Sequence, residues 1–207
     1  MSKKPTIFFA EPNFFPPLPF FYGLLNSDVW VCLDHVRFWP RSYMQKCRLR
    51  SLTGIQNLMV TVKRPCSKPI CQMVINNMHP WQKQLLNAVK HSYSNAPFFK
   101  TYYSAFEYHI NSPNILIETL NVQTTLWIAN TLGKHVPIIF TQNSYMSYPK
   151  AETHDLIEKK LNGIIFDEEF KHPYYKQTLE PFEPDLSVLD ALFCVGANEL
   201  KALLTKK

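Results

Sequence analysis

The sequence predicts an α/β fold: a single domain over residues 1–207, with a mixed sheet that contains a parallel N-terminal β-α-β unit flanked by helices. Three observations support this prediction. The chain has the length of one ordinary domain with a full hydrophobic core. Its hydrophobic content of 46% is typical of a globular protein. Strand-like runs also alternate with helical patterns along the chain.

The first two strands and their connection predict the parallel unit. Residues 6–11 and 28–38 read as strands, the first buried and the second rich in β-forming side chains, and residues 18–27 between them read as a short helix. The connection over residues 12–27 exceeds the roughly 10–12 residues that a parallel crossover needs. We therefore expect the two strands to be parallel neighbours.

The remaining elements follow from periodicity and capping signals. Residues 58–64 alternate in polarity, which predicts a half-buried strand with residues 71–77 as its hairpin partner. Helix signals recur from residue 80 onward, and we predict helices that open at Pro80, at Pro97 and at Ser112 with Pro113, then a strand over 136–144 and helices over 151–162 and 186–204.

The proline-rich stretch AEPNFFPPLPFF (residues 10–21) places a carboxylate at the end of the first strand. Glu11 ends that strand and Asp34 ends the second, so parallel pairing brings both to the carboxyl edge, where open α/β sheets bind ligands. His35 follows Asp34 and is the best candidate for a general base, because imidazole titrates near neutral pH. The alternative is a surface or core histidine.

Positive charge concentrates in the first half of the chain. Residues 1–100 hold 13 Lys/Arg and three acids, a balance of +10, whereas residues 101–207 hold 9 Lys/Arg and 13 acids, a balance of −4. The basic runs are residues 37–50 and 63–68. They are a solvated face, or a surface for a phosphate-bearing ligand or an acidic protein. Nucleic acid is the weakest alternative, since no nucleic-acid-binding motif is present.

Three cations and one thiol in these runs are candidate site residues. Arg37, Lys46 and Lys63 could hold an anionic substrate, and arginine can grip a carboxylate or phosphate bidentately. Cys47 lies between Lys46 and Arg48, which predicts a lowered pKa and makes it the only thiol that we consider as a nucleophile.

The sequence predicts neither a cofactor nor a metal. The five glycines form no GxGxxG or P-loop pattern, and the spacing of Cys66 and Cys71 does not match a zinc site. The five cysteines are an odd number without a CxxC pair, which favours reduced thiols in the cytoplasm. No apolar run reaches the roughly 18–20 residues of a membrane span, so we expect no membrane insertion.

The chain resembles the WbqC-like family at several distinctive stretches. These are EPNFFPPLPFF, SDVWVCLDHVRFWPRSYMQKCRL, LMVTVK, YSNAPFF and HPYYKQTLEPFEPDLSVLDALF. The resemblance implies a cytoplasmic bacterial protein of surface-polysaccharide or specialised-metabolite biosynthesis, and a transferase of acyl or aminoacyl groups with an anionic or carrier-linked substrate. The alternative is a non-catalytic protein that docks an acidic acyl or peptidyl carrier protein.

The tail motif adds two candidate residues. Tyr174 and Gln177 match the family pattern and are either ligand contacts or loop anchors. Ser187 reads as a helix cap, and Asp190, one turn further, faces either solvent or the site.

The chain also departs from the family pattern. Where the family pattern has Gln, a second acid, Asn-Arg and Pro, this chain has Glu11, His35, Gln45-Lys46 and Thr61. A segment of the family pattern is also missing between residues 161 and 167. These departures imply a shortened member with altered or lost activity.

Overall fold

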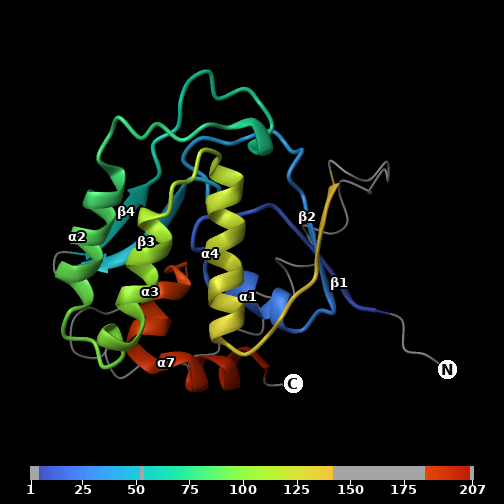
Figure 1. The fold of residues 1–207 in the computed structure, drawn as a ribbon. Coiled ribbons are helices and arrows are strands. Elements are labelled where there is room, and N and C mark those ends of the chain that lie inside the picture. The colour runs from blue at the N-terminus through green and yellow to red at the C-terminus, as the bar shows by residue number, and fades with distance from the viewer. Residues whose placement is uncertain (1–4, 52–53, 142–184, 206–207) are drawn as a thin grey trace.

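The computed structural model describes residues 5–51, 54–141 and 185–205 (Figure 1). The strands are β1 (Ile7–Ala10), β2 (Val29–Cys32), β3 (Lys46–Ser51), β4 (Gly54–Met59) and β5 (Ile138–Phe140). The helices are α1 (Leu18–Leu25), α2 (Trp81–Tyr93), α3 (Phe99–Asn111), α4 (Ile117–Thr131) and α7 (Val188–Thr205), with a 3-10 turn η1 (Ile70–Gln72). The helix predicted over residues 151–162 lies outside the described residues.

The parallel sheet has β2 at its centre and β1 and β5 on its two sides. In the register of the sheet, Ala10 pairs with Cys32, and Cys32 pairs with Phe140, so the three carboxyl ends meet at one edge. α1 connects β1 to β2 as the crossover helix. The α/β class and the parallel β-α-β unit flanked by helices are therefore confirmed.

The antiparallel pairing differs from the prediction. β3 pairs with β4 in a separate two-stranded sheet, whereas the predicted hairpin of residues 58–64 and 71–77 is reduced to a bridge between Val62 and Ile75. Our prediction missed β3 because its basic residues hide the alternation. Cys47 and Leu49 are buried and alternate with the polar positions Lys46 and Arg48.

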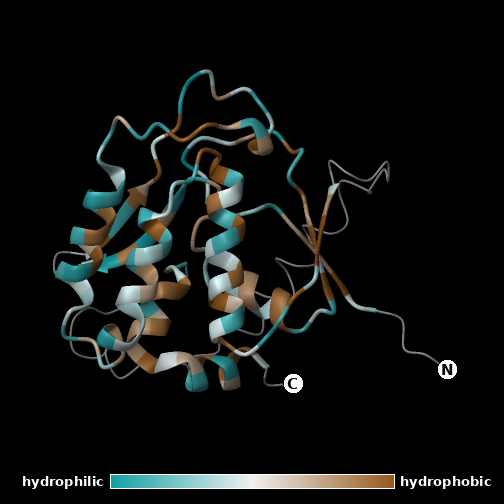
Figure 2. Cartoon of the chain, in the orientation of Figure 1, coloured by the Kyte–Doolittle hydropathy of each residue, from teal (hydrophilic) through white to brown (hydrophobic). Residues whose placement is uncertain are grey.

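The helices bury the faces that their periodicity predicts. Trp81, Leu85 and Val89 of α2 are buried, as are Phe106 and Ile110 of α3. The other two positions of the stripe predicted for α3 differ, because Phe98 is exposed and Tyr102 is half-buried. Figure 2 shows the apolar residues of these helices grouped in bands, and the strands of the parallel sheet coloured as strongly hydrophobic. Within the described ranges, no helix is both long enough and apolar enough to cross a bilayer.

α4 begins later than predicted. Leu116 precedes its first residue, and Ser112 instead ends α3, with its hydroxyl donating to the carbonyl of Tyr108 at 2.9 Å. Four buried side chains of α4 are polar rather than apolar: Glu118, Asn121, Thr124 and Thr125. This helix stands near the centre of the molecule, with the parallel sheet on one side and α2 and α3 on the other (Figure 1).

The segment over residues 12–17 is held from three directions. Asn121 of α4 donates from Nδ2 to the carbonyl oxygens of Pro12 and Met44, both at 2.8 Å. The Phe14 amide donates to the Tyr43 carbonyl at 2.7 Å, and the Val188 amide of α7 donates to the Pro16 carbonyl at 3.1 Å. The proline-rich segment is therefore a junction of the core, not a surface turn.

Replacing Asn121 with alanine should destabilise the protein substantially. The substitution leaves two buried carbonyl oxygens without their donor, at about 1–3 kcal/mol each. We expect the free energy of unfolding to fall by about 2–4 kcal/mol in denaturant titrations. Gln123→Ala, at an exposed position of the same helix, is the control and should change stability by less than about 0.5 kcal/mol. Equal losses in the two variants would contradict this role for Asn121.

Candidate functional site

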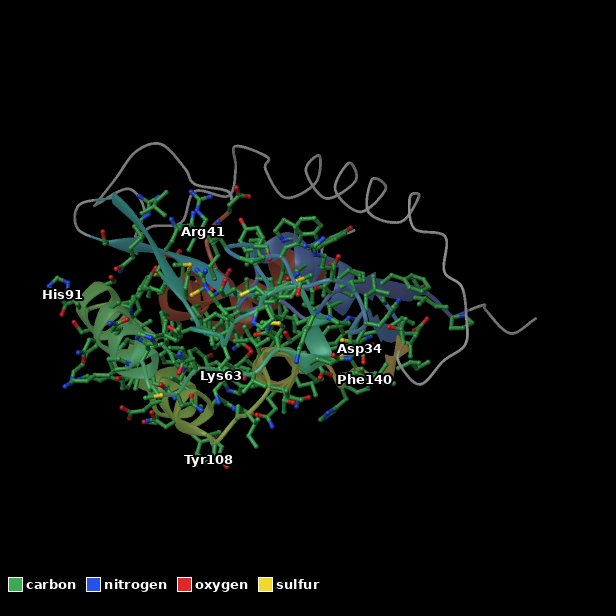
Figure 3. All side chains as sticks on the ribbon, turned by 90° about the horizontal axis from the view of Figure 1, so that it is seen from above. Asp34, Arg41, Lys63, His91, Tyr108 and Phe140 are labelled. Atoms are coloured by element: carbon green, nitrogen blue, oxygen red, sulfur yellow. The ribbon has the colours of Figure 1, made fainter. Side chains whose placement is uncertain are left out.

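Polar side chains follow all three parallel strands at their carboxyl ends. Glu11 follows β1 and is half-buried, Asp34 lies two residues beyond β2 and is fully buried, and Thr141 directly follows β5 and is buried. His35, next to Asp34, is exposed. Figure 3 shows Asp34 and Phe140, the last residue of β5, close together.

The Thr141 hydroxyl joins Asp34 to His35. Oγ1 of Thr141 lies 2.8 Å from Oδ1 of Asp34, 3.1 Å from the carbonyl oxygen of Cys32 and 2.6 Å from Nδ1 of His35. A carbonyl oxygen can only accept, and a carboxylate also accepts, so the single hydroxyl proton points toward them. With Asp34 ionised, the hydroxyl accepts its third hydrogen bond from Nδ1–H of His35.

This hydrogen-bond order assigns the tautomer of the His35 ring. With the proton on Nδ1, the neutral imidazole carries its lone pair on Nε2. Nε2 can then act as a general base, while the hydrogen bond between Nδ1 and Thr141 orients the ring. The Asp34–Thr141–His35 arrangement is thus suited to accept a proton from a bound molecule.

Further acidic groups surround this arrangement. Glu118, in the first turn of α4, is buried, and both its burial and the charge of Asp34 raise the pKa of its carboxyl. Burial, and then the charges of Asp34, Glu118 and Glu11, raise the pKa of the Cys32 thiol. Burial, Asp34 and Glu118 likewise raise the pKa of Cys71. The three carboxylates therefore act on one small region, and a cavity shared by Glu11 and Asp34 stays a prediction.

The predicted anion-binding residues do not form one cluster. Arg37 is exposed, and its guanidinium lies 5.5 Å from the ring centre of Trp39. Lys46 lies over the Tyr43 ring, at 5.9 Å. Lys63 is exposed, and Figure 3 shows it well apart from Asp34. Arg37, two residues from His35, is the cation that the chain places next to the site.

The predicted chemistry of Cys47 is corrected by its burial. The thiol is fully buried on the inner side of β3, and this burial raises its pKa to about 12 instead of lowering it. Its neighbours Lys46 and Arg48 alternate to the other side of the strand, and Arg48 is paired with Asp185 at 3.1 Å. A thiolate nucleophile at Cys47 is therefore not supported.

The structure describes only part of the tail motif. Tyr174 and Gln177 lie outside the described residues. Ser187 accepts from the Leu189 amide at 3.3 Å, as a helix cap does. Asp190 faces the core and neither solvent nor the site: the Tyr93 hydroxyl donates to its Oδ1 at 2.6 Å and accepts from the Arg50 amide at 3.0 Å.

Sequence reasoning missed Thr141 and Glu118 as site residues. Thr141 lay inside the predicted strand over residues 136–144, and its position directly after the last apolar strand residue was the available signal. Glu118 had no distinguishing signal, because an acid in a first helical turn is ordinary. In the part of the chain that the structure describes, no group of three or more His, Cys, Asp or Glu side chains is arranged to hold a metal ion.

Comparison with known proteins gives one family. The model of the WbqC-like protein family matches residues 11–161 and 143–202, which together span most of the chain. No curated protein and no solved structure matches the chain significantly.

The tautomer of His35 can be measured directly. Above the titration range of imidazole, nitrogen chemical shifts should show His35 with its proton on Nδ1 and its lone pair on Nε2. Thr141→Val should return the ring to the mixture shown by the exposed His91 of α2, whereas Thr141→Ser should keep the Nδ1 proton. A ring protonated on Nε2 in the unaltered protein would contradict the assignment.

The buried Asp190 should make stability depend on pH. Burial raises its pKa from the ordinary 3.8 to about 7, although the Tyr93 hydrogen bond and the Arg50 charge lower it. The folded state therefore holds a proton that the unfolded state has lost. Its contribution to stability is complete below about pH 4 and is lost as the pH rises through about 7. Relative to Asp190→Asn, the unfolding free energy of the unaltered protein should fall by up to about 4 kcal/mol between these limits. If the unfolding free energies of the two proteins changed with pH in the same way, Asp190 would be charged in the folded state.

Proposed function

The chain belongs to the WbqC-like protein family, and we propose that it is a transferase of acyl or aminoacyl groups with His35 as its general base. The observation that carries the proposal is the hydrogen-bonded order from Asp34 through Thr141 to Nδ1 of His35. This order leaves the lone pair on Nε2 of an exposed ring, at the sheet edge where open α/β folds bind ligands.

The proposed reaction needs one proton carrier. Nε2 of His35 takes a proton from the amine or hydroxyl of the acceptor while that group attacks the carbonyl carbon of the donor. A new C–N or C–O bond forms, and the bond from the carbonyl carbon to the leaving sulfur or oxygen breaks. The proton then passes from Nε2 to the leaving atom, so that atoms and charges balance.

The neighbouring charges support an anionic or carrier-linked substrate. Arg37 lies two residues beyond His35 on the exposed surface and can pair with a phosphate or carboxylate. Family membership supports a role in the assembly of bacterial surface polysaccharides or specialised metabolites, in the cytoplasm, because the resemblance to this family implies that setting.

A second candidate function is a non-catalytic protein that docks an acidic carrier protein. It is favoured by the charge distribution, since no acid occurs between Asp34 and Glu107. The replacement of the family's second acid by His35 and of its Asn-Arg pair by Gln45-Lys46 also favours it. The two candidates differ in whether the protein accelerates a transfer.

Thiol release from a panel of short acyl and aminoacyl thioesters, measured with and without an added amine acceptor, tests the catalytic proposal. We expect release to exceed the buffer rate when acceptor is present. His35→Asn should lower the rate by about 100-fold or more, as expected for loss of a general base. His91→Asn is the matched control, because Figure 3 shows His91 far from Asp34. A His35→Asn protein as active as the control would leave the binding function instead.

A further inference from the structure

The segment that follows the candidate site exposes a cation and an aromatic ring. Asp34 and Phe38 are buried, whereas His35, Arg37 and Trp39 are exposed. The side chain of Trp39 is 60% exposed, which is unusual for the largest apolar residue type. Its ring is covered on one side by the Arg37 guanidinium.

Backbone hydrogen bonds bring the second basic run against this segment. The Cys71 amide donates to the Asp34 carbonyl at 3.1 Å, the Ile70 amide to the Val36 carbonyl at 3.0 Å, and the Phe38 amide to the Lys68 carbonyl at 3.0 Å. Two basic runs that are far apart in the sequence therefore lie side by side, directly beyond the candidate site.

The combined surface is positively charged. We call it the cationic ridge and define it as Arg37, Trp39, Arg64 and Lys68, all of which are exposed. Figure 1 shows the loop between β4 and η1 projecting above the rest of the molecule. Within the described residues, the three cations of the ridge form no salt bridge with a carboxylate. Their charge is therefore available to a partner.

The shape and composition of the ridge favour a protein over a small ligand. Small ligands bind in concave sites, and a projecting loop is the opposite. Tryptophan and arginine are the residues that most often dominate the energy of protein interfaces. The 72 residues from 35 to 106 contain 11 Lys/Arg and no acid, so a complementary partner must be acidic.

We infer that the cationic ridge docks an acidic carrier protein, which presents the transferred group to His35. This inference rests on the proposed function, because it names the partner of the same site. The segment from Asp34 to Trp39 is continuous with the site, so a partner seated on the ridge places its substrate arm beside the imidazole. Arg37 and Lys68 supply the charge contacts, and Trp39 supplies the apolar contact.

The test measures binding of labelled bacterial acyl and peptidyl carrier proteins by fluorescence anisotropy. We expect binding at about 0.1 M salt and much weaker binding at about 1 M, where the Debye length falls from about 10 Å to about 3 Å. Arg37→Glu and Lys68→Glu should each raise the Kd about tenfold or more at the lower salt concentration. Trp39→Ala should weaken binding at both salt concentrations, since its contact is apolar.

Lys90→Glu and Lys100→Glu are the charge-matched controls, on exposed positions of α2 and α3. They should change the Kd by less than about twofold, because long-range charge is largely screened at about 0.1 M salt. Equal weakening by ridge and control variants would overturn the inference. Absence of carrier binding at the lower salt concentration, or tighter binding of a single-stranded oligonucleotide to the same residues, would also overturn it.

His35→Asn separates this inference from the proposed function. Since His35 lies outside the ridge, the variant should bind the carrier protein as the unaltered protein does. If His35→Asn bound the carrier protein normally and still catalysed group transfer at the unaltered rate, the catalytic proposal alone would be refuted. Loss of transfer in His35→Asn together with normal binding in the ridge variants would refute the docking inference alone.

Discussion

The fold depends on how the proline-rich segment after β1 is held. Asn121 binds the carbonyls of Pro12 and Met44 together, so one side chain fixes both the exit of the first strand and the approach to β3. The aromatic rings of Phe14 and Phe15 then fill the space between α2, α3 and α4, where they contact Trp81, Phe106 and Trp127. Glu11 lies between this segment and β1, whose pairing of Ala10 with Cys32 brings Glu11 to the same sheet edge as Asp34.

The local patterns in the sequence predicted much of this arrangement. The parallel pairing of β1 with β2 followed from the length of the connection, and α2 and α3 followed from apolar spacing. The antiparallel sheet did not, because β3 lies in a basic run whose outward lysine and arginine obscure the buried alternation of Cys47 and Leu49. Packing across the molecule, rather than local preference, selects its partner.

The candidate site, too, could be predicted only in part from the sequence. Glu11, Asp34 and His35 could be named because strand ends are marked in the sequence. The hydroxyl that connects two of them belongs to Thr141, which directly follows β5 and lies 106 residues beyond His35, and no local pattern links such distant residues. At Cys47 the sequence instead suggested a function that the structure does not support. Lys46 and Arg48 are its neighbours in sequence and predicted a thiolate, but on the strand their side chains point to the face opposite the thiol. Asp34 and Asp190 are both buried, yet one lies at the sheet edge and the other in the helical core, and only tertiary structure separates them.

The hydroxyl of Thr141 has a consequence for the energetics of proton transfer at His35. When Nε2 receives a proton, the imidazolium still carries hydrogen on Nδ1, so the bonds from Nδ1 to Thr141 and from Thr141 to Asp34 keep their direction. No rotor has to turn and no buried dipole has to reverse as charge appears on the ring. The negative end of this chain already points toward the imidazole before the proton arrives. The surroundings of His35 are thus preorganised for the charged state, and the reorganisation that water would have to undergo is avoided.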